Sequence, residues 1–127
     1  MPAAGHFVIN NFELQCGHVL PEATVVYQTY GELAPKRDNV ILYPTSYGAQ
    51  HPDLEWLIRP DGILDPQRWF IIIPNQFGNG LSSSPSNCQH CQLRESGFWF
   101  THWDNLRAQD QLLLTVFGIE QLAMVYG

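Results

Sequence analysis

Short runs of apolar residues, separated by turn-forming residues, set the pattern of this chain. Residues 7–15 and 23–30 alternate loosely between apolar and polar side chains. Turn-forming residues flank the two runs, among them Gly17, Pro21 and Gly31. This alternation predicts two strands of an antiparallel hairpin, each with one face toward a core.

Three later runs are apolar throughout, at residues 39–44, 69–75 and 121–127. Continuous apolar runs of this length are typical of strands that are buried on both faces. A short helical piece is expected between the first two, around residues 54–58. Residues 76–100 are rich in Gly, Ser, Asn and Pro, which predicts a long loop. A loop of this length inside a compact domain is usually functional or marks a wrong assignment.

A helix is predicted to begin at Thr101, because Asp104 follows three residues later and completes a capping box. Gly118 is a suitable residue to end it. Asp104 and Arg107 are expected to form a surface ion pair on this helix. Its apolar positions are predicted to share one face: Leu106, Leu113, Leu114 and Phe117.

The order of these elements predicts the fold class. Buried strands separated by crossover segments indicate an α/β protein. Its sheet should be mixed and mostly parallel, and it should begin with the antiparallel hairpin. The 127 residues are enough for one small domain over 1–127, with no second domain.

Composition excludes several classes of partner. The formal net charge is -6, and the six basic residues are scattered, which argues against nucleic acid and anionic membranes as partners. We recognise no signal peptide and no apolar run near the ~20 residues of a membrane helix. The three cysteines do not suggest a disulfide framework. A cytoplasmic location is the expectation.

Candidate chemistry lies where the predicted buried strands end. Gly127 closes the last strand, as the first glycine of a G-x-S-x-G nucleophile elbow would. Residues 43–48 lie at the end of the first buried strand, and their small, turn-forming residues suit a loop that exposes a backbone N–H to an oxyanion. Residues 74–80 carry glycines and short polar side chains that suit a substrate pocket. Taken singly, each pattern is also that of an ordinary strand end, turn or surface loop, and that simpler interpretation is favoured.

A C-x-x-C pair, Cys88 and Cys91, has His90 between its cysteines and His102 nearby. A structural zinc site normally combines two such ligand pairs, and only one is present. We therefore expect exposed loop thiols here and no metal site.

Several blocks together resemble one family. The segment THWDNLRAQDQLL, followed by FGIEQLAMVYG, is similar to a helix-and-strand block of the homoserine O-acetyltransferase group of the α/β-hydrolase superfamily. LPEATVVYQTYGEL and DNVIL resemble its opening hairpin and first buried strand, and FIIIPNQFGNGLSSSPS resembles its asparagine- and glycine-bearing loop. The resemblance covers roughly residues 12–127. It implies the N-terminal part of an α/β-hydrolase fold.

The resemblance also implies an activity and the residues that take part in it. The activity is acyl transfer from an acyl-CoA to an amino-acid hydroxyl such as that of homoserine, through an acyl-enzyme, in methionine biosynthesis. Ser46 takes the position whose backbone N–H serves the oxyanion hole. The substrate pocket is expected to include Tyr47, Gly48, Asn75 and Gly78.

The same resemblance places the catalytic triad outside these residues. In the family the nucleophilic serine follows the glycine aligned with Gly127, and the aspartate and histidine come later. The chain is therefore expected to contain no catalytic triad residue and to be inactive alone.

Two departures from the family pattern leave the reaction open. PTSYG stands after the first buried strand, and FGNGLSSSPS stands in the asparagine loop, where the transferases have other residues. An esterase-like hydrolase is one alternative, and a truncated, non-catalytic module is another. No bound cofactor is expected. The complete enzyme would act on a small molecule and could be a homo-oligomer.

Overall fold

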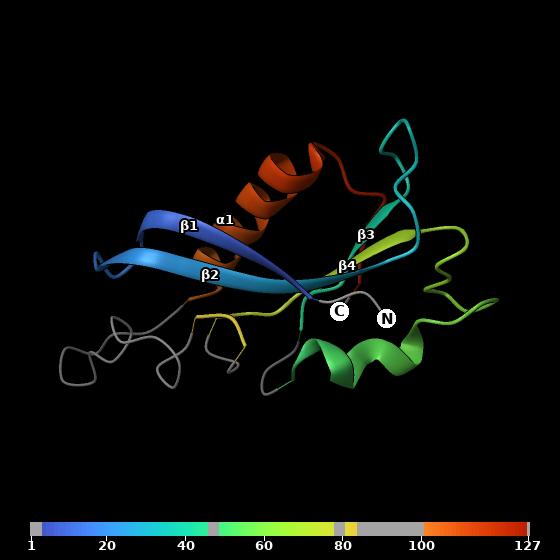
Figure 1. The fold of residues 1–127 in the computed structure, drawn as a ribbon, viewed down its shortest axis with the longest axis horizontal. Helices are drawn as coiled ribbons and strands as arrows, with labels where there is room; N and C mark the ends of the chain where they lie inside the picture. The colour runs from blue at the N-terminus through green and yellow to red at the C-terminus, as the bar shows by residue number, and fades with distance from the viewer. Residues whose placement is uncertain (1–3, 46–48, 78–80, 84–100, 127) are drawn as a thin grey trace.

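The computed structural model describes residues 4–45, 49–77, 81–83 and 101–126. Its sheet has five strands in the order β1-β2-β4-β3-β5 (Figure 1). The strands are β1 (Gly5–Glu13), β2 (Val19–Tyr30), β3 (Val40–Leu42), β4 (Phe70–Pro74) and β5 (Met124–Val125).

The predicted hairpin is confirmed. β1 and β2 pair antiparallel, with Gly5 opposite Tyr27 and Glu13 opposite Val19. The connecting turn contains Gly17 at a φ of 97°, a conformation that glycine adopts without strain. β2 begins before Pro21, which we expected to lie outside the strand.

The other strands form the parallel part of the sheet. β3 pairs parallel with both β4 and β5, whereas β2 pairs antiparallel with β4. Every residue of β3 and β4 is buried, as their continuous apolar runs predicted. The sheet is therefore mixed, and it starts with the antiparallel hairpin, as an α/β fold of this class requires.

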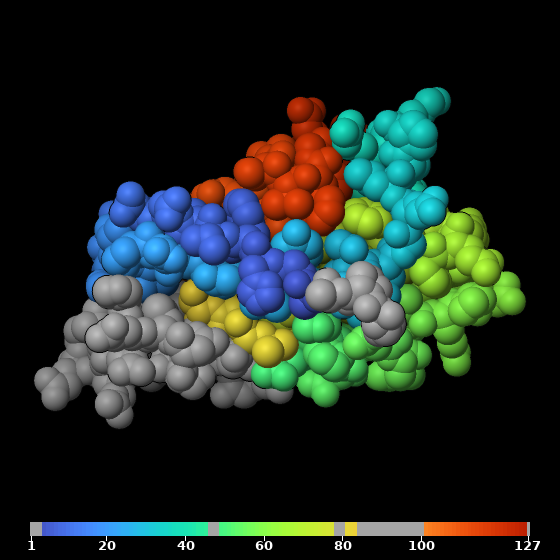
Figure 2. Space-filling model, in the orientation of Figure 1, coloured from blue at the N-terminus to red at the C-terminus, as the bar shows by residue number. Residues whose placement is uncertain are grey.

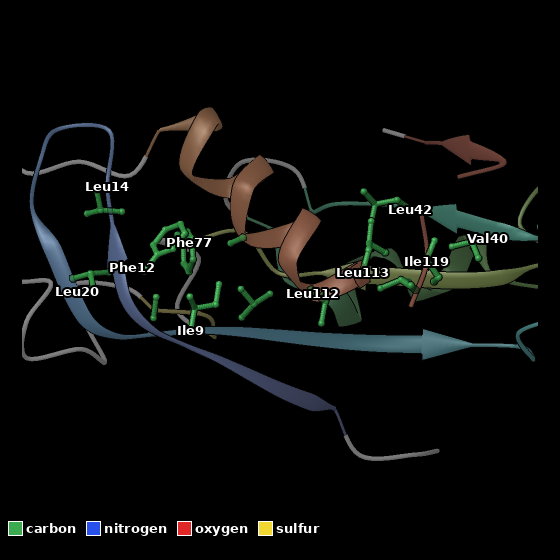
Figure 3. Close-up of a cluster of buried hydrophobic side chains, with 14 of the residues drawn as sticks. Ile9, Phe12, Leu14, Leu20, Val40, Leu42, Phe77, Leu112, Leu113 and Ile119 are labelled. Atoms are coloured by element: carbon green, nitrogen blue, oxygen red, sulfur yellow. The ribbon is translucent and has the colours of Figure 1, made fainter. Parts of the chain in front are cut away.

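Elements pack on both faces of the sheet. On one face lie α1 (His102–Leu112) and the π-helical turn η4 (Leu113–Phe117) (Figure 1). Their side chains Leu112 and Leu113 join the larger core, which includes Phe12 and Phe77 (Figure 3). The 3-10 helix η1 (His51–Leu57) covers the other face, where Leu54 and Leu57 pack on Ile41, Ile71 and Ile73. η1 is the short helical piece expected around residues 54–58.

The start of α1 confirms the predicted capping box. Thr101 N–H donates to Asp104 Oδ2 at 2.9 Å, and Asp104 N–H donates to Thr101 Oγ1 at 3.2 Å. Asp104 is fully buried, and its other oxygen accepts the Gln15 N–H at 2.8 Å, which offsets part of the cost of burying the carboxylate. The cap therefore also fixes the helix to the turn of the hairpin.

The expected surface ion pair between Asp104 and Arg107 is wrong. Both carboxylate oxygens of Asp104 accept backbone N–H groups. The Arg107 guanidinium instead donates to the Glu13 carbonyl at 2.6 Å and lies 4.8 Å from the centre of the Phe12 ring. Both residues thus fasten α1 to the hairpin.

The predicted apolar face of the helix is wrong in part. Leu113 is buried and Phe117 packs against the core, but Leu106 and Leu114 are 58% and 47% exposed. The buried side of α1 carries polar residues as well, because Asp104 and Asn105 satisfy backbone groups there. Beyond Leu112 the helix widens into the π turn, which changes the angular spacing of the side chains that follow.

The last predicted strand is also corrected. β5 covers only Met124–Val125, and these residues are 39% and 62% exposed rather than buried. β5 forms the outer edge of the sheet, which accounts for the exposure of its side chains.

Candidate active site at the carboxyl ends of β3 and β4

The candidate site lies where two parallel strands end side by side. β3 and β4 run in the same direction, so Thr45 and Asn75, which follow them, come to the same edge of the sheet. Ligands of open α/β sheets bind outside the carboxyl ends of the strands. Both side chains are polar and only 1% exposed, so their hydrogen bonds determine the local geometry.

Asn75 connects three segments of the chain. Its backbone N–H and its Nδ2 each donate to the Val26 carbonyl of β2 at 2.8 Å. Its Oδ1 accepts the His51 N–H at 2.8 Å, and its Nδ2 lies 2.9 Å from His51 Nδ1. A single buried amide thus joins the end of β4, the edge of β2 and the start of η1.

Thr45 connects the ends of the two parallel strands. Its N–H donates to the Pro74 carbonyl at 3.3 Å, and its Oγ1 accepts the Gln76 N–H at 3.1 Å. Thr45 was not singled out in the sequence, although it lies in the segment expected to supply the oxyanion donor. The sequence signal that could have identified Thr45 is a hydroxyl directly after an apolar strand.

Two serines complete the edge of β2 beyond the end of β4. Ser82 Oγ accepts the Val26 N–H at 2.8 Å and donates to the Asn75 carbonyl at 2.6 Å. Ser83 Oγ accepts the Thr24 N–H, and Ser83 N–H donates to the Thr24 carbonyl, both at 2.8 Å. In Figure 2 the segment 81–83 (yellow) lies directly against the hairpin (blue). These hydroxyls have a structural role.

α1 reaches the same loop through Asn105. Its Oδ1 accepts the Phe77 N–H at 2.8 Å, and its Nδ2 donates to the Thr101 carbonyl at 3.1 Å. The chain after β4 is therefore held in position from β2, from β3 and from α1.

The structure places one of the predicted site residues, and their roles stay predictions. Asn75 lies at the carboxyl end of β4, where the pocket was expected. Outside the described residues lie Ser46, Tyr47, Gly48, Gly78, Cys88 and Cys91. His51 was expected to be an ordinary loop residue, but it is the first residue of η1 and a partner of Asn75.

Two tyrosines beside these strands have perturbed acidity. Burial raises the pKa of Tyr43, which follows β3 and packs edge-on against Tyr126, and Tyr126 raises it further. Burial also raises the pKa of Tyr30, and the nearby Glu55 carboxylate adds to the shift. Both phenols are neutral at neutral pH, as an unperturbed tyrosine also is.

Two features are absent from the part of the chain that the structure describes. No helix there is long and apolar enough to cross a membrane. No group of three or more His, Cys, Asp or Glu side chains there could hold a metal ion.

The sheet order, the antiparallel hairpin and the crossovers define the class: this is the N-terminal part of an α/β-hydrolase fold. It superimposes on an acetylester hydrolase from Corynebacterium glutamicum with a TM-score of 0.87 and 38% identity, over 96% of this chain and 36% of that one. The acetyl esterase MekB gives a TM-score of 0.88 and 35% identity, over 98% of this chain and 36% of that one. No family profile matches the chain.

Related sequences include both esterases and acyltransferases. The chain is 40% identical to a probable esterase of C. glutamicum and 39% identical to an ethyl acetate hydrolase of Pseudomonas veronii, each over 94% of its length. It is 31% identical to a homoserine O-acetyltransferase of Geobacter sulfurreducens over 92% of its length and 36% of that protein. The chain spans about a third of the two esterases, 35% and 34% respectively.

Proposed function

We propose that this chain forms the N-terminal part of a serine-dependent acyl-transfer enzyme that hydrolyses small acetyl esters. The observation that carries the proposal is the 39–40% identity to two esterases, which runs along 94% of the chain. A polar junction at the ends of β3 and β4 consists of Thr45, Asn75 and His51. This junction lies inside the matched region. The esterase, given as an alternative in the sequence analysis, thus becomes the first candidate.

In this proposal the chain supplies part of the oxyanion hole and of the pocket. The loop after β3 offers the Ser46 backbone N–H to the developing oxyanion. Tyr47, Gly48, Asn75 and Gly78 shape the pocket around it. The nucleophilic serine, the aspartate and the histidine come from residues that follow Gly127 in the complete enzyme. The described serines, Ser82 and Ser83, are engaged with the backbone of β2.

The proposed reaction has two steps. The serine hydroxyl attacks the ester carbonyl, a base takes its proton, and the alcohol leaves with a proton to form an acyl-enzyme. Water then attacks the acyl-enzyme, which releases acetate and restores the serine. A backbone donor aimed at the oxyanion accelerates both steps, since each passes through a tetrahedral intermediate.

A second candidate is acyl transfer from an acyl-CoA to an amino-acid hydroxyl such as that of homoserine. The resemblance of residues 101–127 and the 31% identity to a homoserine O-acetyltransferase favour it. The two reactions share the acyl-enzyme and differ in whether water or a hydroxyl accepts the acyl group. In this case acyl-CoA is a co-substrate, and the enzyme works in methionine biosynthesis in the cytoplasm.

The test is a chimera in which this chain replaces the matched region of the C. glutamicum esterase. We expect saturable hydrolysis of p-nitrophenyl acetate that a serine-directed phosphonate abolishes. Acetyl-CoA with homoserine should give less O-acetylhomoserine than acetate; the reverse ratio would favour the second candidate. A folded chimera that forms neither product would contradict acyl transfer altogether.

A further inference from the structure

The segment after β3 is anchored at both of its ends by the residues at the end of β4. At the near end, Thr45 N–H donates to the Pro74 carbonyl, and Thr45 Oγ1 accepts the Gln76 N–H. At the far end, His51 contacts the Asn75 amide through its backbone N–H and its ring. The segment after β3 thus runs from Thr45 to His51, and residues 74–76 bind both of these end residues.

The orientation of the Asn75 amide follows from its buried partners. Nδ2 must face the Val26 carbonyl at 2.8 Å, and Oδ1 must face the His51 N–H at 2.8 Å. A flipped amide would place two acceptors together at Val26 and two donors together at the His51 N–H. Since Asn75 is only 1% exposed, water cannot compensate for either conflict.

This orientation determines the proton position on the imidazole. The Asn75 Nδ2 also lies 2.9 Å from His51 Nδ1, and its second hydrogen is available for that contact. Nδ1 must therefore accept, which leaves the ring proton of neutral His51 on Nε2. A proton on Nδ1 would set two donors against each other across this distance.

We propose that His51 is a positioning residue, held as the Nε2–H tautomer by Asn75, that fixes the far end of the segment following β3. The role builds on the proposed function, in which this segment carries the oxyanion donor. Two contacts to one amide fix both the backbone and the ring of His51. Small displacements of a donor at a reacting centre lower turnover strongly.

The proton position is tested on the full chain, independently of any activity. Magic-angle-spinning ¹⁵N NMR of histidine-labelled protein at pH 8, where free imidazole is neutral, reports which ring nitrogen carries hydrogen. This method also works on associated samples. The His51 signals are assigned by their loss in His51→Asn. We expect an unprotonated Nδ1 and a protonated Nε2, and a hydrogen on Nδ1 would overturn the proposal.

The positioning role is tested by rescue in the esterase chimera. His51→Asn retains a side-chain acceptor close to the position of Nδ1, whereas His51→Leu removes it. We expect kcat for p-nitrophenyl acetate to fall about tenfold or more in His51→Leu and to stay within about threefold in His51→Asn. His6→Leu, on the exposed side of β1, is the matched control and should leave kcat unchanged.

The outcomes separate the two proposals. Equal kcat for His51→Leu and the parent chimera would overturn the positioning role while leaving the esterase proposal intact. A folded but inactive parent chimera would contradict the proposed function, and the NMR result on the chain would still decide the tautomer of His51.

Discussion

Two edges of this sheet are completed in different ways. Where β2 extends past the end of β4, its backbone groups are bonded by Asn75, Ser82 and Ser83, all 5% exposed or less. At β5 the outer edge carries Met124 and Val125, whose side chains are 39% and 62% exposed. The first edge is closed by polar side chains from this chain, and the second has no covering element among the described residues.

This difference indicates that hydrogen bonds within the chain determine the geometry at the edge of β2 but not at the outer edge of β5. A buried backbone group must find a partner, so each serine or asparagine bonded to β2 adopts one arrangement. An exposed apolar edge imposes no such arrangement, and it favours pairing with another strand. The candidate site lies beside the first edge. Its geometry therefore depends on contacts that the described residues already contain.

The largest predicted effect removes part of the larger core, which lies between the helix and the sheet. Leu112 is fully buried under α1, among side chains of β1, β2, β3 and β4. Leu112→Ala should lower the free energy of unfolding by about 2–5 kcal/mol, because a cavity remains. Urea unfolding measures this loss. Leu106→Ala, 58% exposed on the same helix, should change it by less than about 0.5 kcal/mol. Similar losses for the two leucines would refute the corrected helix face.

A smaller effect is expected at the edge of β2. Ser82→Ala leaves the buried Val26 N–H without its acceptor, which should cost about 1–3 kcal/mol. The control is Thr115→Val, which removes an exposed hydroxyl and should cost less than about 0.5 kcal/mol in the same urea titration. If Ser82→Ala were as harmless as its control, the polar closure of this edge would contribute nothing to stability.

The smallest change in stability is expected at β5. Val125→Lys should alter the free energy of unfolding by less than about 0.5 kcal/mol, since the side chain is already exposed. It should reduce self-association in light scattering, because a charge on an apolar edge opposes strand pairing. Val8→Lys, on the polar edge strand β1, serves as control. Equal scattering by Val125→Lys and the unmodified chain would show that β5 is not the associating edge.

Sequence patterns predicted the parts of this fold that depend on local contacts. The capping box of Thr101 and Asp104 needs only residues three apart, and it was found. The hairpin and the buried strands β3 and β4 follow from alternation and from continuous apolar runs.

The sequence predictions were wrong where contacts between segments that are distant in the sequence determine the structure. The exposure of Leu106 and Leu114 could not be predicted, because the hairpin turn draws Asp104 into the interior and η4 alters the spacing. β5 is shorter than its apolar run, because only Met124 and Val125 pair with β3.

The candidate site likewise has a part that the sequence could predict and a part that it could not. Asn75 could be selected as a polar residue directly after a buried strand. Its contact with His51 could not be predicted, because the two residues come together only when β3 and β4 pair in parallel. Ser82 and Ser83 belong to a serine-rich segment that the sequence presented as loop, and only the folded hairpin shows their acceptor role.

The central claim is that the polar junction at the end of β4 is where this chain contributes to acyl transfer. The most direct measurement compares kcat for p-nitrophenyl acetate between the esterase chimera and its Asn75→Ala variant, below the thermal transition of both. Asn10→Ala, an exposed asparagine on β1, is the matched control. The account predicts a fall of about tenfold or more for Asn75→Ala and no change for Asn10→Ala, because Asn75, unlike Asn10, helps to anchor the segment after β3. Unchanged turnover in a folded Asn75→Ala chimera would contradict it.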